Sequence, residues 1–230
     1  MIIVIMIVFG ILSFAVSSRL KSKFKKYSQI PLGRNLSGAE IAKLMLADHG
    51  IQDVDVTCVE GQLTDHYNPV NRTVNLSKEV YHGRNAAAAA VASHECGHAV
   101  QHATAYSMLE FRSAMVPMQN ASAKILNVIF MVMLFGGFML PSFIPWNMAL
   151  LVIIGAYSIM TLFSFVTLPV EFDASKRALA WIDERGIVNS QEHGMAKDAL
   201  KWAAMTYVVV ALGSLVTLLY YLSLFLGNRD

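Results

Sequence analysis

Four long stretches of the chain contain no charged residue. They span residues 1–18, 125–144, 146–168 and 203–226. A helix needs roughly 20 apolar residues to cross the hydrocarbon core of a bilayer, so the last two stretches are long enough, the second is just long enough and the first is short. A buried core helix would explain any one of them, but four in 230 residues would leave too little polar surface to cover them. The pattern therefore predicts about four transmembrane helices.

The first stretch is followed, rather than preceded, by basic residues. A cleaved secretory signal carries its basic residues before the apolar run. The triplet Ala15-Val16-Ser17 is only a weak match to a cleavage site. This order favours an uncleaved membrane anchor whose N-terminus lies outside, with cleavage as the less favoured alternative.

The basic residues also indicate how the chain is oriented. If the N-terminus lies outside, segments 19–124 and 169–202 lie inside. These two segments contain 17 of the 18 Lys and Arg residues, as the positive-inside rule requires, although they are also the longest polar segments. We therefore predict a multi-pass protein of the cell (plasma) membrane whose two polar segments face the cytosol. Both cysteines, Cys58 and Cys96, would stay reduced there.

The first polar segment combines helix and strand patterns. Ser37 and Glu40 have the spacing of a capping box ahead of an apolar-periodic run, which predicts a helix over residues 38–49. The further predicted elements are a strand over 54–59, a loop over 64–69, a strand over 72–76 and an alanine-rich helix over 85–102. The expected fold class is thus mostly α: a polytopic membrane protein with about four transmembrane helices and a small α+β unit.

Composition and charge narrow the classes of protein further. Hydrophobic residues make up 55% of the chain and charged residues only 15%, whereas soluble domains are nearer 45–50% and about 25%. A freely soluble enzyme, a disordered chain and a disulfide-rich secreted module are excluded. The net charge of +2 gives no reason to expect a nucleic-acid partner.

The motif with the clearest chemistry is His94-Glu95-Cys96-Gly97-His98. Histidines four residues apart lie on the same face of a helix, so both imidazoles can bind one zinc ion. Glu95 flanks that face and is expected to take a proton from a zinc-bound water. Cys96 points away from the metal face and is expected to pack in the core. Gly97 predicts the close approach of another element.

A catalytic zinc needs a third protein ligand and one open position. Glu171 and Asp173 directly follow the third apolar stretch, where Pro169 is expected to begin a helix. The hairpin formed by the second and third apolar stretches would return the chain to the side of the membrane that holds His94 and His98. The further carboxylates of the second polar segment are Asp183, Glu184, Glu192 and Asp198.

Four segments resemble the YugP-type membrane zinc metallopeptidases, and the resemblance extends over nearly the whole chain. They are His94–Gln101, Leu168–Ala178, Gly61–Pro69 and Trp202–Tyr207. That family is similar to the gluzincins, including membrane proteases of the HtpX and Ste24 type, so the resemblance implies a zincin-like unit. It implies His94, His98 and Glu171 as metal ligands and Glu95 as the general base. It also implies that the strand near 72–76 is the edge on which a peptide substrate pairs.

The chain departs from the HtpX-like pattern at one position. There an Asp four residues after the ligand Glu orients a ligand histidine, whereas this chain has Ser175. Asp173 or another group is a possible substitute. Arg177 is expected to pair with Asp173 or Glu171, or to lie on the surface.

Two further residues, His66 and Tyr67, lie in the polar loop predicted over 64–69. They are expected either to donate a hydrogen bond to the oxyanion of peptide hydrolysis or to fix the loop. His102 is expected either to pack or to support the metal ligands, with packing favoured, and His193 to be a solvated helix residue.

The resulting hypothesis is a membrane-embedded, zinc-dependent endopeptidase that binds one Zn²⁺ per chain and acts on peptide or membrane-protein substrates at the cytosolic face of the bilayer. The predicted parts are a transmembrane helix (1–18), a metalloprotease part with the HExxH helix (19–124), a transmembrane hairpin (125–168), a helical segment with the third ligand (169–202) and a transmembrane helix (203–226). The alternative is a non-catalytic, zinc-binding membrane scaffold or chaperone-like protein. A small transporter is disfavoured because no charged residue lies within the apolar stretches.

Overall fold

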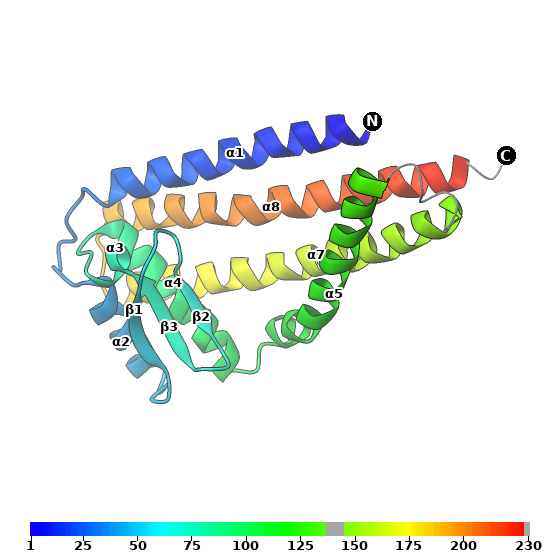
Figure 1. Cartoon of the computed structure of the whole chain (residues 1–230). Helices are drawn as coiled ribbons and strands as arrows, with labels where there is room; N and C mark the ends of the chain where they lie inside the picture. The colour runs from blue at the N-terminus through cyan, green and yellow to red at the C-terminus, as the bar shows by residue number, and fades with distance from the viewer. Residues whose placement is uncertain (137–144, 228–230) are drawn as a thin grey trace. The chain divides into compact units, whose positions relative to one another are not determined.

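The computed structural model describes residues 1–136 and 145–227. The chain divides into a polar unit (Phe14–Glu110 and Pro169–Thr206) and an apolar unit (Met1–Ser13, Phe111–Leu168 and Tyr207–Asp230). Three long helices contribute residues to both units: α1 (Ile2–Tyr27), α7 (Trp146–Glu184) and α8 (Ser190–Gly227). Figure 1 shows these elements along the chain. The predicted class, mostly helical with a small sheet, is confirmed.

The polar unit contains a small mixed sheet with helices packed on it. Its elements are α2 (Gly38–Asp48), β1 (Asp55–Val59), β2 (His66–Asn68), β3 (Thr73–Ser77), α3 (Lys78–Tyr81) and α4 (Ala86–Ala103). The strand order is β1-β3-β2, with β1 parallel and β2 antiparallel to β3. Buried side chains of α2, β3, α4 and α7 form its core, among them Ile41, Leu76, Cys96 and Ile182.

Two predictions about the strands are wrong. The predicted loop over 64–69 contains β2, which pairs with β3 through Tyr67 opposite Val74. The strand predicted at 72–76 is not an edge, because β3 lies in the middle of the sheet with a partner on each side. The edge strands are β1 and β2. Three residues are too short a run for alternation to indicate a strand.

The two helices predicted in this unit are confirmed, and each begins at an N-terminal cap, of which only the one at α2 was predicted. Ser37 and Glu40 form the predicted capping box at α2, in which the Ser37 side chain accepts from the Glu40 backbone and the Glu40 side chain accepts from the Ser37 backbone. Asn85 caps α4 by accepting from the backbone of Ala88 at 2.9 Å. Such caps satisfy backbone donors that the first helical turn leaves free.

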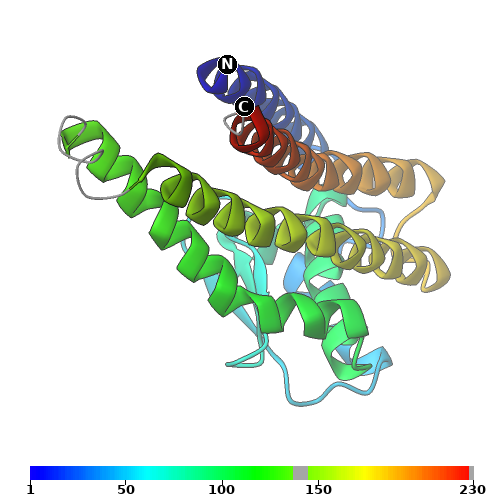
Figure 2. The same ribbon diagram turned by 90° about the vertical axis from the view of Figure 1, so that its right-hand side faces the viewer.

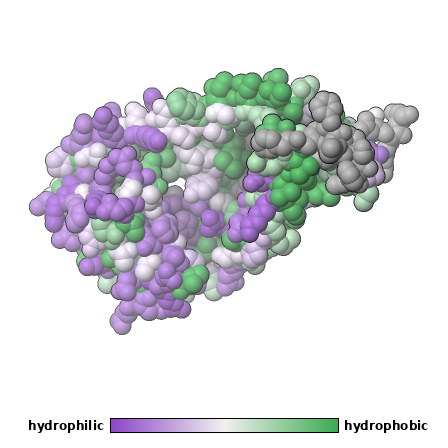
Figure 3. All heavy atoms as spheres, in the orientation of Figure 1, coloured by the Kyte–Doolittle hydropathy of each residue, from purple (hydrophilic) through white to green (hydrophobic). Residues whose placement is uncertain are grey.

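Three helices of the described residues are long and apolar enough to cross a membrane: α1, α7 and α8. The second predicted stretch, residues 125–144, begins within α5 (Ser107–Gly136), and its remainder, 137–144, lies outside the described residues. Figure 3 shows hydrophobic residues gathered over the N-terminal half of α1, where side chains such as Ile3, Phe14 and Ile11 are exposed. A bilayer would cover such a surface.

The third apolar stretch and the segment after it form one helix. Pro169 was expected to begin a new helix, but it lies inside α7, which continues to Glu184. Proline inside a membrane helix is tolerated when neighbouring groups satisfy the freed backbone positions. The apolar run of α7 therefore leads without a break to Glu171, so that one helix contains both.

Helices α1 and α8 run side by side in both ribbon views (Figures 1 and 2). Within the apolar unit, Gly213 lies against the ring of Phe9. Within the polar unit, Asp198 on α8 accepts a hydrogen bond from the Tyr27 hydroxyl at 2.5 Å and pairs with Lys23 at 2.7 Å. These contacts join the basic end of α1 to α8.

Candidate metal centre

Two histidines of α4 and one glutamate of α7 converge in the polar unit. His94 and His98 lie one turn apart with their ring centroids 4.8 Å from each other. Oε2 of Glu171 lies 3.4 Å from Nε2 of His94 and 3.6 Å from Nε2 of His98. All three potential ligand atoms lie within 4.8 Å of one another, so a single metal ion can contact all of them.

The close approach of α7 to α4 depends on Gly97. A Cβ atom at this position would lie 2.6 Å from the backbone oxygen of Ala174, closer than real side chains come. Ala174 and Ala178 of α7 are both fully buried. Small residues on both helices thus bring their backbones together, as the sequence predicted for Gly97, and so place Glu171 beside the two histidines.

The chemistry of the cluster fits a zinc ion. The side chains of His94 and His98 are 12% exposed and that of Glu171 only 5%. Oε2 of Glu171 is buried and has no hydrogen-bond partner among the described residues. A buried, unpaired carboxylate oxygen is costly unless a cation satisfies it. Imidazole nitrogen and carboxylate oxygen are both ordinary zinc ligands.

Charges around the cluster shift two pKa values. Burial alone would lower the pKa of His98, but the negative charges of Glu171 and Glu95 outweigh burial and raise it. Burial alone would raise the pKa of Glu171, but the two imidazoles have the larger opposing effect and hold it well below its ordinary value. Glu171 is therefore ionised at neutral pH, the state that a metal ligand needs.

Each histidine has a different partner at its other ring nitrogen. Nδ1 of His94 lies 3.1 Å from Oγ of Ser175, and Nδ1 of His98 lies 3.0 Å from Oε1 of Gln101. Ser175, the residue that departs from the HtpX-like pattern, therefore contacts one of the candidate ligand histidines itself. Such contacts fix the ring orientation and leave Nε2 free to bind a metal.

Asp173 and Arg177 hold Gln101, the partner of His98, in place. The side-chain amide of Gln101 donates to Oδ2 of Asp173 at 2.9 Å and to the backbone oxygen of Val170 at 2.8 Å. Arg177 pairs with Asp173 at 2.5 Å, not with Glu171, and its guanidinium lies over the ring of Tyr106. A continuous series of contacts thus runs from Arg177 to His98.

No role was predicted for Gln101, although it lies inside the segment His94–Gln101 that resembles the zinc metallopeptidases. Its side chain is fully buried. The one signal available was its position three residues after His98, which places both side chains on the same helix face.

The side chain of Glu95 is held by strand β2. Glu95 is 8% exposed, and its Oε2 accepts a hydrogen bond of 3.0 Å from the backbone N–H of Tyr67. The Tyr67 hydroxyl lies 2.8 Å from Nδ1 of His102. His102 was expected to pack, but it is exposed and bonded to Tyr67. Two contacts therefore attach β2 to α4 beside the metal cluster.

His66 lies on the other face of the sheet. Adjacent residues of a strand point to opposite faces, and Tyr67 faces α4. Nδ1 of His66 lies 2.7 Å from the backbone oxygen of Thr64, and its Nε2 lies 3.3 Å from the amide nitrogen of Asn75. The structure thus brings Tyr67, but not His66, to the side of the sheet that faces Glu95.

The remaining candidates lie away from the metal ligand atoms. Cys96 is fully buried, its thiol contacts the backbone oxygen of Ala42 at 3.5 Å, and burial raises its pKa. His193 on α8 is half-buried. Packing of Cys96 agrees with the sequence-based expectation.

Comparison with known proteins gives a family and a relative. The family model described as "Putative neutral zinc metallopeptidase" matches residues 2–226. The chain is 39% identical over 219 residues to the "Putative membrane protease YugP" of Bacillus subtilis (strain 168), which covers 95% of this chain and 94% of that protein. No solved structure matches the chain.

Proposed function

Because this chain belongs to the family described as putative neutral zinc metallopeptidases, we propose that it is a zinc-dependent membrane endopeptidase. It binds one Zn²⁺ through His94, His98 and Glu171, and Glu95 is its general base. Its substrates are peptides or membrane proteins, which it cleaves at the cytosolic face of the cell membrane.

The observation that carries this proposal is the convergence of the three ligand atoms around a buried carboxylate oxygen that has no hydrogen-bond partner among the described residues. Two of the ligands come from α4 and the third from α7, 73 positions further along the chain than His98. Three protein ligands with one open position are typical of catalytic zinc sites, whereas structural sites use four.

The residues around the ligands have distinct roles in this proposal. When bound, zinc supplies a Lewis acid that polarises the scissile carbonyl and activates the attacking water. Glu95 accepts the proton of that water and passes it to the leaving amine. The Tyr67 backbone N–H holds the Glu95 carboxylate in place, while Ser175 and Gln101 hold the two imidazoles.

Strand β2 is the edge on which we propose that the substrate pairs. It is hydrogen-bonded on one side to β3, and within the described part of the chain its other side has no strand partner. Tyr67 on this strand bonds Glu95 directly, so a peptide added here would lie next to the general base. Main-chain pairing of this kind recognises an extended peptide.

The decisive experiment compares wild type with Glu95→Gln in the purified full-length protein. Glu95→Gln preserves the shape of the side chain and the metal ligands, so the variant should retain one zinc per chain. Peptide hydrolysis should fall by at least 100-fold, since positioned acid–base catalysis contributes on the order of 10²–10⁴-fold.

Glu184→Gln is the matched control, because Glu184 is exposed near the end of α7 and the chemical change is the same. It should leave both zinc content and hydrolysis unchanged. Undiminished hydrolysis by zinc-loaded Glu95→Gln would exclude Glu95 as the base. Zinc binding by wild type with no turnover of any peptide would favour the alternative function, a zinc-binding scaffold.

A further inference from the structure

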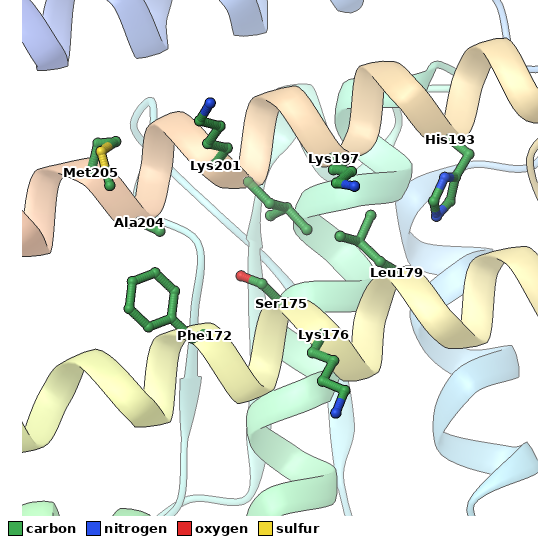
Figure 4. A pocket seen from close by; sticks show the side chains of 10 residues that line it. Phe172, Ser175, Lys176, Leu179, His193, Lys197, Lys201, Ala204 and Met205 are labelled. Atoms are coloured by element: carbon green, nitrogen blue, oxygen red, sulfur yellow. The ribbon is translucent and has the colours of Figure 1, made fainter.

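A pocket with a volume of about 410 Å³ lies between α7 and α8 within the polar unit. Small-molecule sites are commonly of this size. The metal ligands and Glu95 are not among its lining residues. Positions 172, 175, 176 and 179 recur at the spacing of one helix face of α7, and positions 193, 197, 201 and 205 do so on α8. Figure 4 shows both sets of side chains.

The lining combines an apolar surface with a basic margin. Its apolar members are Phe172, Leu179, Leu200, Ala204 and Met205. Lys176, Lys197 and Lys201 are exposed, and no carboxylate lines the pocket. Within residues 1–136 and 145–227, none of these lysines is within ion-pair distance of an acidic side chain. Three exposed cations around an apolar pocket complement an anionic amphiphile.

The position of the pocket along the helices agrees with this chemistry. Phe172 comes shortly after the apolar stretch of α7, and Ala204 and Met205 begin that of α8. In Figure 4 these three residues lie together at one end, while Leu179 and His193 lie at the other. The apolar end of the pocket is therefore the end at which both helices enter their candidate membrane spans. Lipid headgroups lie at this level of a bilayer.

We propose that this pocket binds an anionic phospholipid. The phosphate lies among Lys176, Lys197 and Lys201, and an acyl chain lies against Phe172 and Met205. Lys176 and Lys201 extend to opposite sides of the pocket in Figure 4, and their flexible stems can fold over a headgroup. Ser175 lines the pocket and also contacts His94, so a bound lipid would adjoin a residue that holds a metal-binding histidine.

The test measures which lipid the full-length protein retains when phosphatidylglycerol and phosphatidylcholine are supplied in equal amounts, using native mass spectrometry. Wild type should prefer phosphatidylglycerol. The triple variant Lys176→Gln/Lys197→Gln/Lys201→Gln should lose this preference by on the order of 100-fold, since each lysine near a lipid phosphate contributes about fivefold. The matching substitutions to Arg should keep it.

Lys43→Gln/Lys78→Gln/Arg185→Gln is the matched control. It removes the same charge from exposed residues of the polar unit that lie outside the lining of this pocket, and should keep the preference. Zinc content and melting temperature of each variant report whether it is folded. Neither readout needs peptidase activity, so failure of this proposal and failure of the proposed function are distinguishable.

A second measurement uses the unmodified protein. Phosphatidylglycerol should protect Lys176, Lys197 and Lys201 from acetylation, and should leave Lys43 and Lys78 as reactive as they are in phosphatidylcholine. Equal retention of phosphatidylglycerol by the pocket variant and wild type, or no protection, overturns the proposal. Displacement of the lipid by inorganic phosphate would also overturn it, because the pocket would then be a site for free anions. Displacement by a peptide that binds the wild type but not the pocket variant would overturn it as well, because the pocket would then be a substrate subsite.

Discussion

The two histidines of the metal centre are held in different ways. His94 contacts a lone hydroxyl, that of Ser175, whereas His98 contacts Gln101, which is itself held by Asp173 and a backbone carbonyl. A carboxylate opposite a ligand histidine raises the basicity of the ring and tightens metal binding. The hydroxyl of Ser175 provides orientation without that charge.

Replacing Ser175 tests this difference. Ser175→Ala removes the contact with Nδ1 of His94, so the zinc dissociation constant should rise by about 10–100-fold. Ser175→Asp restores an acceptor with a charge and should bind zinc at least as tightly as wild type. Competition with a chelator of known affinity measures both.

The control for Ser175 is Ser158→Ala, because the Ser158 hydroxyl bonds the backbone oxygen of Ile154 in its own helix. It should leave zinc affinity unchanged. Equal affinity in Ser175→Ala and wild type would show that Ser175 does not orient His94.

Sequence reasoning at the residue scale succeeded where the relevant residues lie on one helix. His94, Glu95 and His98 are spaced within a single turn, so their geometry follows from helix periodicity. The partners of the histidines depend on which residues of α7 meet α4. That meeting depends on the packing of two helices, so Ser175 was left in doubt and Gln101 was not singled out.

At the scale of the elements, the close contact between α4 and α7 brings the three candidate metal ligands together. Gly97 leaves no room for a side chain, and the fully buried Ala174 lies opposite it. The glycine weakens the helix by up to about 1 kcal/mol compared with alanine. In return, the two helix backbones approach closely enough for Glu171 to reach the histidines.

Gly97→Ala should therefore separate the helices. The added Cβ must push Ala174 away, so the free energy of unfolding should fall by about 1–3 kcal/mol, as is typical of overpacking. Zinc affinity should fall as well, because Glu171 moves with α7. Chemical denaturation and zinc titration measure the two effects.

Gly194→Ala is the matched control on α8, since a Cβ there would meet nothing within 4 Å. It should be neutral or slightly stabilising, because alanine favours helix. If Gly97→Ala behaved in the same way, the close approach would not be what positions Glu171.

The elements were predicted correctly where signals within the element itself are strong. They were predicted wrongly where the structure of a segment depends on a partner far away in the sequence. The capping box at Ser37 and the alanine run after Asn85 identified α2 and α4. Strand β2 exists because it pairs with β3, and the central place of β3 depends on that pairing. Pro169 remains inside α7, although proline most often ends a helix.

At the scale of the whole molecule, the three candidate spans were predictable because they are long charge-free runs, and length and composition are enough to identify them. The orientation in the membrane is a separate question. It rests on the distribution of Lys and Arg, and the proposal places the whole polar unit in the cytosol.

The two cysteines offer a test of orientation without any substitution. Cys58 is exposed on β1, whereas Cys96 is fully buried and its pKa is raised by burial. A membrane-impermeant maleimide should label neither in intact cells, should label Cys58 after permeabilisation, and should label Cys96 only after unfolding.

Cys58→Ser controls for the site of labelling and should abolish the signal in permeabilised cells. Labelling of Cys58 in intact cells would place the polar unit, and the candidate metal centre within it, on the outside of the cell.

The most direct test of the central claim measures peptide cleavage while zinc is returned to the metal-free, full-length protein. The account predicts no cleavage without zinc, a linear rise as zinc is added, and a plateau at one zinc per chain. Glu171→Gln should not reach this plateau, because it lacks the third ligand. Cleavage that persists in the metal-free protein, or one bound zinc per chain without any cleavage, would contradict the account.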